Sequence, residues 1–209
     1  MNDENAPQQP EAIELSSIEF QSPGRFTVRN PASISPDTAQ AEPAPFTLGS
    51  HLPMERFHDA ALARAHLLAL LQQARRSLCL YSQDLEPWLF NHSSVEQACS
   101  DFLRIHPRNH LRILLRDSSR AVQDGHRLLQ LSKRLSSNFQ IRKLHPDYPI
   151  EEIAFVLADN NGLLVLPTPE RAEGYALYQD GVRNRQRQEQ FDRAWESSLS
   201  DSNLRSFLL

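Results

Sequence analysis

The sequence predicts an α/β fold with a mixed, mostly parallel sheet flanked by helices and preceded by a disordered tail. Three observations lead to this prediction. Residues 51–144 alternate between helical and extended apolar patterns, which is typical of strands joined by helices. Residues 152–179 hold three apolar segments with no helix between them, so part of the sheet is expected to be antiparallel. Residues 1–50 lack long apolar runs.

The N-terminal segment, residues 1–50, differs in composition from the rest of the chain. It holds seven of the 14 prolines, and seven acidic residues against two basic ones. Such a segment cannot bury enough apolar surface to offset the entropy lost on ordering, so a mostly disordered acidic tail is expected. Residues 12–30 alternate weakly around a Pro-Gly pair, and a short hairpin docked on the domain is the alternative. The α/β domain itself is expected over residues 51–209.

Charge, cysteines and hydropathy exclude several classes of protein. The net charge of −4 comes from the tail, because residues 51–209 carry 20 basic and 19 acidic residues. This near-neutral balance argues against strong nonspecific binding of nucleic acid. Cys79 and Cys99 lie in apolar segments without metal-ligand spacing, so we expect core positions in a reducing compartment. Without a signal peptide or a membrane-spanning apolar run, the expected location is cytoplasmic.

Four segments have the 3.6-residue apolar period of amphipathic helices: 56–76, 93–106, 119–136 and 184–199. Ser93 and Glu96 fit a capping box at the start of the second helix. Gly125 shares the inward face of the third helix, where a missing side chain would let the helix approach the sheet closely. His126 is expected on the solvent flank of the same helix.

Six short apolar segments are expected as strands: 77–83, 110–117, 139–144, 152–158, 163–167 and 174–179. The turn Asn160-Asn161-Gly162 predicts a hairpin between the fourth and fifth strands. Trp88 follows Pro87 in a connecting segment, and we expect it to pack on the core rather than to face a partner.

Motifs for the familiar phosphate, metal and hydrolase chemistries are missing from the sequence. The six glycines form neither G-x-G-x-x-G nor G-x-x-x-x-G-K, and no G-x-S-x-G elbow occurs. Histidines and cysteines never take zinc-site spacing. The sequence therefore predicts neither a cofactor nor a metal ion.

The order of elements over residues 55–199 nevertheless resembles a phospholipase D-like domain. One helix ends in "QQARRSLCLYSQDL", the strand "HLRILLRD" follows the next helix, and a late apolar strand ends on Asp159. The resemblance implies a motif H-x-K-x-x-x-x-D on this late strand. In it the histidine attacks phosphorus, and the lysine on the same strand face holds a phosphate oxygen. The resemblance also implies that two such motifs meet at one site, from one chain or from a dimer.

When Asp159 takes the place of the motif aspartate, Glu152 occupies the histidine position and Ala154 the lysine position. A carboxylate would repel a phosphodiester, and alanine offers no charge to hold it. Asp159 has a local structural interpretation as well, because aspartates before turns accept backbone hydrogen bonds. The resemblance therefore implies a degenerate motif, and a pseudoenzyme from an uncharacterised bacterial family.

His110, Arg112 and Asp117 reproduce the motif spacing on another strand, with arginine in place of lysine. In the phospholipase D-like family that the chain resembles, the corresponding strand is structural rather than catalytic. We therefore expect an exposed strand start here, and keep catalysis by these three residues as the alternative.

Basic residues late in the chain form a further candidate binding site for an anion: Arg142, Lys143, Arg183 and Arg185. Positive charge at the start of the last helix opposes the helix dipole, which slightly favours an anion from outside. The alternative is that these side chains are exposed to solvent and have no binding role.

Together these patterns favour a catalytically inactive phospholipase D-like domain that binds or regulates an unidentified partner. One alternative is a divergent phosphodiesterase or nuclease. Another is an accessory domain that partners an acyltransferase. Homodimerisation is implied by the resemblance alone, because single-motif members of that superfamily pair across their sites.

Overall fold

A seven-stranded sheet runs through the described part of the chain, residues 42–149 and 151–200 of a computed structural model. Its strands are β1 (Glu55–Phe57), β2 (Ser77–Ser82), β3 (His110–Leu115), β4 (Phe139–Lys143), β5 (Ala154–Ala158), β6 (Gly162–Leu166) and β7 (Gly174–Leu177). They lie side by side in the order β1-β7-β6-β5-β2-β3-β4. The predicted tail, up to residue 41, and its alternative hairpin over residues 12–30 lie outside the described residues.

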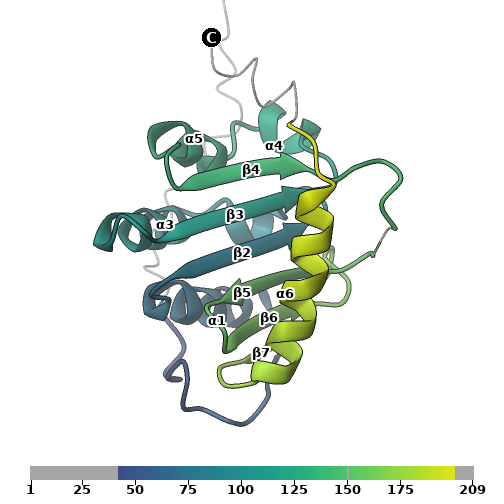
Figure 1. The fold of residues 1–209 in the computed structure, drawn as a ribbon. Helices are drawn as coiled ribbons and strands as arrows, with labels where there is room; N and C mark the ends of the chain where they lie inside the picture. Colours follow the sequence, from purple (N-terminus) through teal and green to yellow (C-terminus); the bar gives the residue numbers. More distant parts are fainter. Residues whose placement is uncertain (1–41, 150, 201–209) are drawn as a thin grey trace, which may run out of the picture. The chain divides into compact units, whose positions relative to one another are not determined.

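Strand directions confirm a mixed sheet but correct its expected balance. Only the pairs β2–β3 and β3–β4 are parallel, and their arrows point to the same edge in Figure 1. The other four neighbouring pairs are antiparallel, so the sheet is mostly antiparallel and not mostly parallel. The reason is the short connections between β5, β6 and β7, because short turns can only join antiparallel neighbours.

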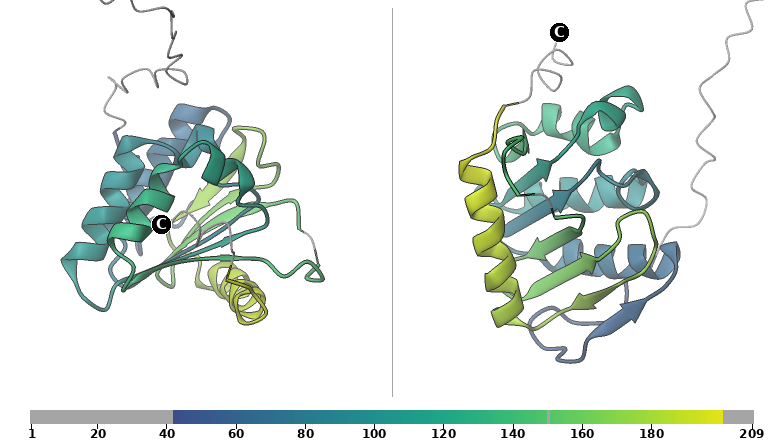
Figure 2. Two further views of the ribbon diagram at one scale, coloured as in Figure 1. Left: turned by 90° about the horizontal axis from the view of Figure 1, so that it is seen from above. Right: turned by 90° about the vertical axis from the view of Figure 1, so that its right-hand side faces the viewer.

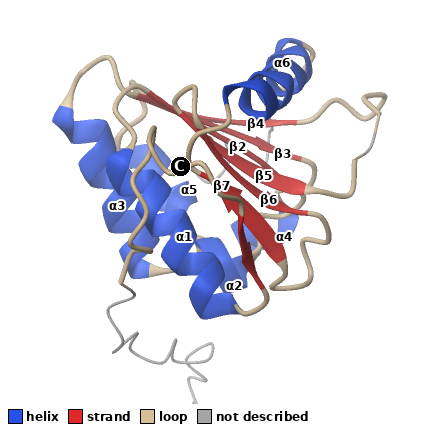
Figure 3. Ribbon diagram, turned by 90° about the horizontal axis from the view of Figure 1, so that it is seen from below, coloured by secondary structure: helices blue, strands red, loops and turns tan. Residues whose placement is uncertain are grey.

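The helices cover the two faces of the sheet unequally. They are α1 (Ala60–Gln73), α2 (Pro87–Phe90), α3 (Ser93–Ile105), α4 (Ser119–Gln123), α5 (Arg127–Arg134) and α6 (Gly181–Glu196). Helices α1, α3 and α5 lie on one face, and α6 alone crosses the other (Figures 2 and 3). No helix in the described ranges has the length and apolar character needed to cross a membrane.

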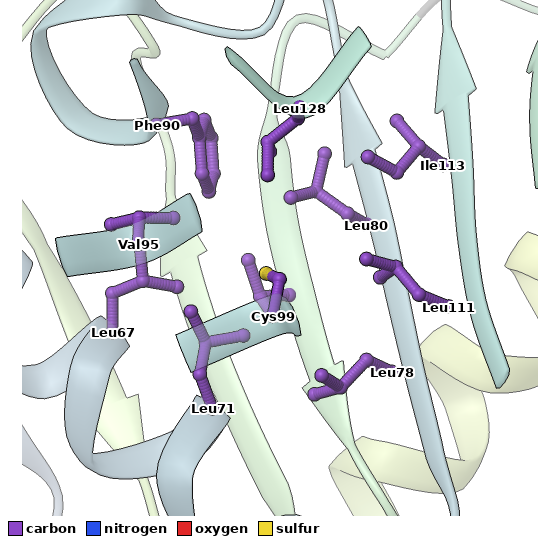
Figure 4. A pocket seen from close by; sticks show the side chains of 11 residues that line it. Leu67, Leu71, Leu78, Leu80, Phe90, Val95, Cys99, Leu111, Ile113 and Leu128 are labelled. Carbon is purple, nitrogen blue, oxygen red and sulfur yellow. The ribbon is translucent and has the colours of Figure 1, made fainter. Parts of the chain in front are cut away.

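Alternating side chains of the central strands supply two separate cores. In β2, Leu78 and Leu80 face α1 and α3, whereas Cys79 and Tyr81 face α6. Both cysteines are free and buried, as predicted. Figure 4 shows the sulfur of Cys99 in the larger core, beside an apolar void of about 10 Å³. A void of this size is at the limit for one water molecule and has no polar lining to hold it.

Two boundaries differ from the sequence prediction because local hydrogen bonds decide them. Helix α1 begins at Ala60, since the side chain of Asp59 accepts a hydrogen bond from the backbone N–H of Leu62 (2.8 Å). Residues 56 and 57, expected in that helix, instead belong to strand β1. Phe46 and Leu48, assigned to the tail, pack on the core, and the Leu48 N–H donates to Gln73 Oε1 (2.8 Å).

The helix predicted over residues 119–136 is two helices, α4 and α5. Gly125 lies between them with φ of +61°, a left-handed conformation that ends a helix and that glycine adopts at low cost. The prediction that His126 faces solvent is wrong, because His126 lies in the break as the N-cap residue of α5 and not on a continuous helix. His126 is fully buried, and its Nδ1 accepts the N–H of Leu128 (3.2 Å) at the start of α5.

The predicted capping box on α3 does not form as expected. His92 rather than Ser93 occupies the N-cap position. Glu96 pairs with Arg127 (3.4 Å) and with Arg134, both of α5, and so ties α3 to α5. Trp88 packs against the larger core as predicted, and its indole N–H donates to the carbonyl oxygen of Pro169 (3.1 Å).

Candidate functional site

Two of the residues that the resemblance assigns to the motif, Glu152 and Ala154, lie where the parallel strands end. Strand β5 runs antiparallel to β2, with Tyr81 opposite Phe155. Continuing this register places Ala154 opposite Ser82 and Glu152 opposite Asp84. We call this side of the sheet the motif edge, comprising residues 82–88, 116–120, 151–154 and 167–170.

The two motif positions at this edge carry one carboxylate and one methyl group. Glu152 is exposed, and Glu151 beside it accepts a hydrogen bond from the Arg187 guanidinium (3.0 Å). Ala154 is fully buried in the larger core. Neither motif position therefore offers a nucleophilic imidazole or a cation for a phosphate oxygen.

A buried glutamate is the most perturbed acid of the motif edge. Glu86 is 3% exposed, and its Oε2 accepts a hydrogen bond from the hydroxyl of Ser82 (2.7 Å). Burial raises the pKa of Glu86 to about 8, against the effect of the Ser82 hydrogen bond, and the charge of Asp84 raises it further. Glu86 is therefore mostly protonated at neutral pH.

The backbone next to Glu86 is strained. Leu85 is buried with φ of +65°, a left-handed conformation that is rare for a leucine. Its N–H donates to the Ser82 hydroxyl (2.7 Å), which helps to hold this conformation. Backbone strain and an acid with a shifted pKa often occur together at functional sites.

Glu86 lines a small cavity of about 110 Å³ at the motif edge. Among its lining residues, Asp84, Glu86 and Glu170 carry carboxyl groups, and Arg120 is the single cation. Arg120 pairs with Asp84 (2.9 Å), so its charge is already compensated. The cavity is acidic and suits a neutral or cationic group better than a phosphate.

The third motif residue, Asp159, lies at the opposite edge and has a structural role. Its carboxylate accepts three backbone hydrogen bonds, from Arg75 (2.8 Å), Arg76 (2.8 Å) and Ser77 (3.0 Å). Asp159 accepts backbone hydrogen bonds as predicted, but the N–H donors lie in the α1–β2 connection and at the start of β2, not in the turn after β5. Asp159 has φ of +52°, which aspartate tolerates better than most residues.

The alternative catalytic residues on β3 do not converge. His110 is exposed at the start of the strand, and Asp117 follows its end, about 20 Å away at 3.3 Å per residue. Arg112 pairs with Asp192 of α6 (3.0 Å) and lies over the ring of Phe191 (5.1 Å). Asp117 accepts the N–H and hydroxyl of Ser119, and these hydrogen bonds lower its pKa.

The residues of the predicted anion site are not gathered at one place either. Arg142 lies over the ring of Trp195 (4.6 Å), near the end of α6. Arg183 pairs with Asp180 (3.3 Å) at its start, and Arg185 is exposed one turn further on. Ten residues of helix, or about 15 Å, separate Arg185 from Trp195. The backbone of Lys143 bridges to Leu199.

Similarity to solved structures agrees with the fold predicted from the resemblance. Nuc from Salmonella typhimurium, a phospholipase D family member, superposes with a TM-score of 0.53 at 10% identity, over 72% of this chain and 97% of that chain. NucT from Helicobacter pylori gives 0.54 at 11% identity, over 72% and 100%. TrmBL2, described as an archaeal chromatin protein with a novel mode of DNA binding, gives 0.50 at 14% identity, over 73% and 56%.

The phospholipase D-like fold is thereby confirmed, although identities this low establish the fold alone. A family model described as a domain of unknown function, DUF7931, matches residues 59–207. No curated protein sequence matches the chain.

Proposed function

Since the chain belongs to the DUF7931 family, a domain family of unknown function, and has a phospholipase D-like fold, we propose that it is a catalytically inactive member that works as a binding module. The observation that carries the proposal is the chemistry of the motif edge. Glu152 and Ala154 occupy the positions of the nucleophile and of the phosphate-holding cation. Of the described residues that line the neighbouring cavity, three carry carboxyl groups, one of them the mostly protonated Glu86, and the one cation, Arg120, is paired with Asp84.

Phosphodiester cleavage needs both a nucleophile and positive charge around the transferred phosphorus. At the motif edge the exposed carboxylates of Glu151 and Glu152 would raise the energy of an approaching diester by Coulomb repulsion. Arg187 and Arg120 are each paired with a carboxylate there. Arg116, the other cation of the motif edge, is outnumbered by the carboxyl groups of the same residues. The edge is thus chemically unsuited to the reaction of its structural relatives.

The test is a phosphodiesterase assay of the purified full chain with bis(p-nitrophenyl) phosphate and with phosphatidylcholine vesicles. We expect hydrolysis at the rate of buffer alone for wild type and for Glu152→Gln, which removes one exposed charge without disturbing the core. Substantial hydrolysis by wild type that Glu86→Gln abolishes would place a working catalyst at the motif edge and overturn the proposal.

The enzymatic alternative requires His110 and Arg112 to act together. Arg112 is engaged by Asp192 and by two aromatic rings, whereas His110 is exposed at the strand start. The same assay decides between the hypotheses, because His110→Ala would remove any activity of this kind. An accessory role beside an acyltransferase remains a prediction, which co-purification with such an enzyme would test, and light scattering would test the implied homodimer.

A further inference from the structure

A second hollow lies at the sheet edge opposite the motif edge, where β2 and β3 begin. It measures about 700 Å³, and its lining includes Leu48, Arg75, Ile105, His106 and Asp159. We call it the basic groove. From its position and side chains we infer that the basic groove binds an acidic peptide segment of a partner protein. This inference rests on the proposed role as a binding module but not on the proposed loss of catalysis.

Positive charge is concentrated in the two connections that border the basic groove. Arg75 and Arg76 lie between α1 and β2, whereas Arg104 and Arg108 lie at the end of α3 and just before β3. All four are exposed. Among the described residues no ion pair joins any of their side chains to a carboxylate, in contrast to Arg112, Arg120, Arg127, Arg134, Arg183 and Arg187.

The parallel pairing of β2 with β3 brings these two connections together. Ser77 lies opposite His110, and the His110 N–H donates to the carbonyl oxygen of Arg76 (3.2 Å). Neighbouring strands are about 4.8 Å apart, so arginines far apart in the sequence share one surface. Figure 1 shows the starts of both strands at the same edge, beside the end of α3.

Asp159, the residue at the aspartate position of the motif, holds the backbone on one side of the basic groove. Asp159 accepts the N–H groups of Arg75, Arg76 and Ser77, which sets the backbone that carries the two arginines. Asp159 is the one carboxylate among the described residues that line the groove, whereas Arg75 lines it and three further arginines lie in the adjoining connections, so the surface around the groove is positive. Asp159 is therefore a positioning residue here, acting through the backbone and not through contact with the ligand.

The groove also offers apolar surface. Ile105 is 72% exposed at the end of α3, although it lines the hollow, and Leu48 lines it as well. An exposed branched aliphatic side chain surrounded by arginines gains free energy when a partner covers it. This combination fits a peptide whose carboxylates pair with the guanidinium groups and whose aliphatic side chain covers Ile105.

Nucleic acid fits the basic groove less well than an acidic peptide. Single strands are held largely by stacking on aromatic side chains, and no Phe, Tyr or Trp is among the described residues that line the groove. A phosphate backbone would satisfy the arginines but leave Ile105 uncovered. The near-neutral charge of residues 51–209 also gives little general attraction for a polyanion.

The experiment measures fluorescence polarisation of a fluorescein-labelled oligoglutamate peptide with one central leucine, titrated with the full chain. We expect Arg75→Glu/Arg108→Glu to weaken binding about tenfold or more. The matched control is Arg56→Glu/Arg193→Glu, which makes the same change in net charge at exposed positions on β1 and α6. The control should change affinity less than twofold. Thermal unfolding of each variant checks that all four substitutions leave the fold intact.

A second comparison tests the apolar contact. Ile105→Ser should weaken binding of the leucine peptide and leave a matched peptide with central serine unaffected. The inference is overturned when both charge-reversal pairs weaken binding equally, or when Ile105→Ser affects both peptides equally. It is also overturned when a labelled DNA duplex or single strand binds more tightly than the peptide. Failure of peptide binding leaves the proposed loss of catalysis standing, and detection of phosphodiesterase activity leaves the basic groove standing.

Discussion

Replacement of Asp159 by alanine tests how far the motif strand still serves the fold. The substitution removes the acceptor for three backbone N–H groups, two of them exposed and one partly buried. At about 1 kcal/mol for each bond in this half-exposed setting, the loss is about 3 kcal/mol. The left-handed backbone at φ of +52° costs alanine about 1 kcal/mol more. We therefore expect a total loss of about 4 kcal/mol in the free energy of unfolding.

Two further substitutions at the same position separate these contributions. Asp159→Gly removes the acceptor but accepts the left-handed backbone, so it should cost about 3 kcal/mol. Asp159→Asn keeps one acceptor oxygen and a tolerance for positive φ, so it should cost about 1 to 2 kcal/mol. Urea denaturation followed by circular dichroism measures all three. The reasoning is refuted when Asp159→Ala lies within about 0.5 kcal/mol of wild type, the range of an ordinary surface substitution.

The remaining predictions concern buried groups. Burial raises the pKa of Glu86 from 4.5 to about 8, so the contribution of Glu86 to the free energy of unfolding is lost as pH rises from about 4.5 to about 8. Glu86→Gln should reduce this loss of stability, which a series of urea denaturation midpoints at different pH values measures. Burial lowers the pKa of His126 from 6.5 to about 4, so stability should fall as pH drops through that window, and His126→Gln should remove this component. Leu71→Ala enlarges the void beside α1 and should cost about 2 to 5 kcal/mol, whereas the exposed control Leu52→Ala should cost less than about 0.5 kcal/mol in the same assay.

Apolar periodicity was sufficient to predict most strands and the two long helices of the larger core. It could not predict strand direction, because direction depends on which neighbour each strand joins. Strand β2 lies between β3 and β5, and the sequence contains no local signal that β5 adds on that side. The break at Gly125 was missed for a related reason: Ala121 and Leu128 continue one apolar phase across it, although the backbone turns at the glycine.

The candidate site was predictable only where sequence spacing alone defines it. Spacing from Asp159 assigns the motif positions to Glu152 and Ala154, which stays a prediction, and the antiparallel register of β5 with β2 places both residues beside the end of β2. Glu86 could not be identified in this way, because its perturbed pKa results from burial among residues of α2 and of the segment after β6. The arginines of the basic groove were missed because about 30 residues separate its two halves, and only strand pairing unites them.

Strand β5 connects two edges of opposite electrostatic character, and the residues that the resemblance assigns to its motif have different roles at its two ends. At the motif edge, no side-chain hydrogen bond within residues 42–149 and 151–200 involves Glu152 or Ala154, so the fold does not depend on polar contacts of these two side chains. At the other edge, Asp159 holds the α1–β2 connection through three backbone hydrogen bonds. Its removal would disturb the sheet whether or not the protein is an enzyme. The hydrogen bonds of Asp159 therefore give this aspartate a role in folding and in the display of Arg75 and Arg76.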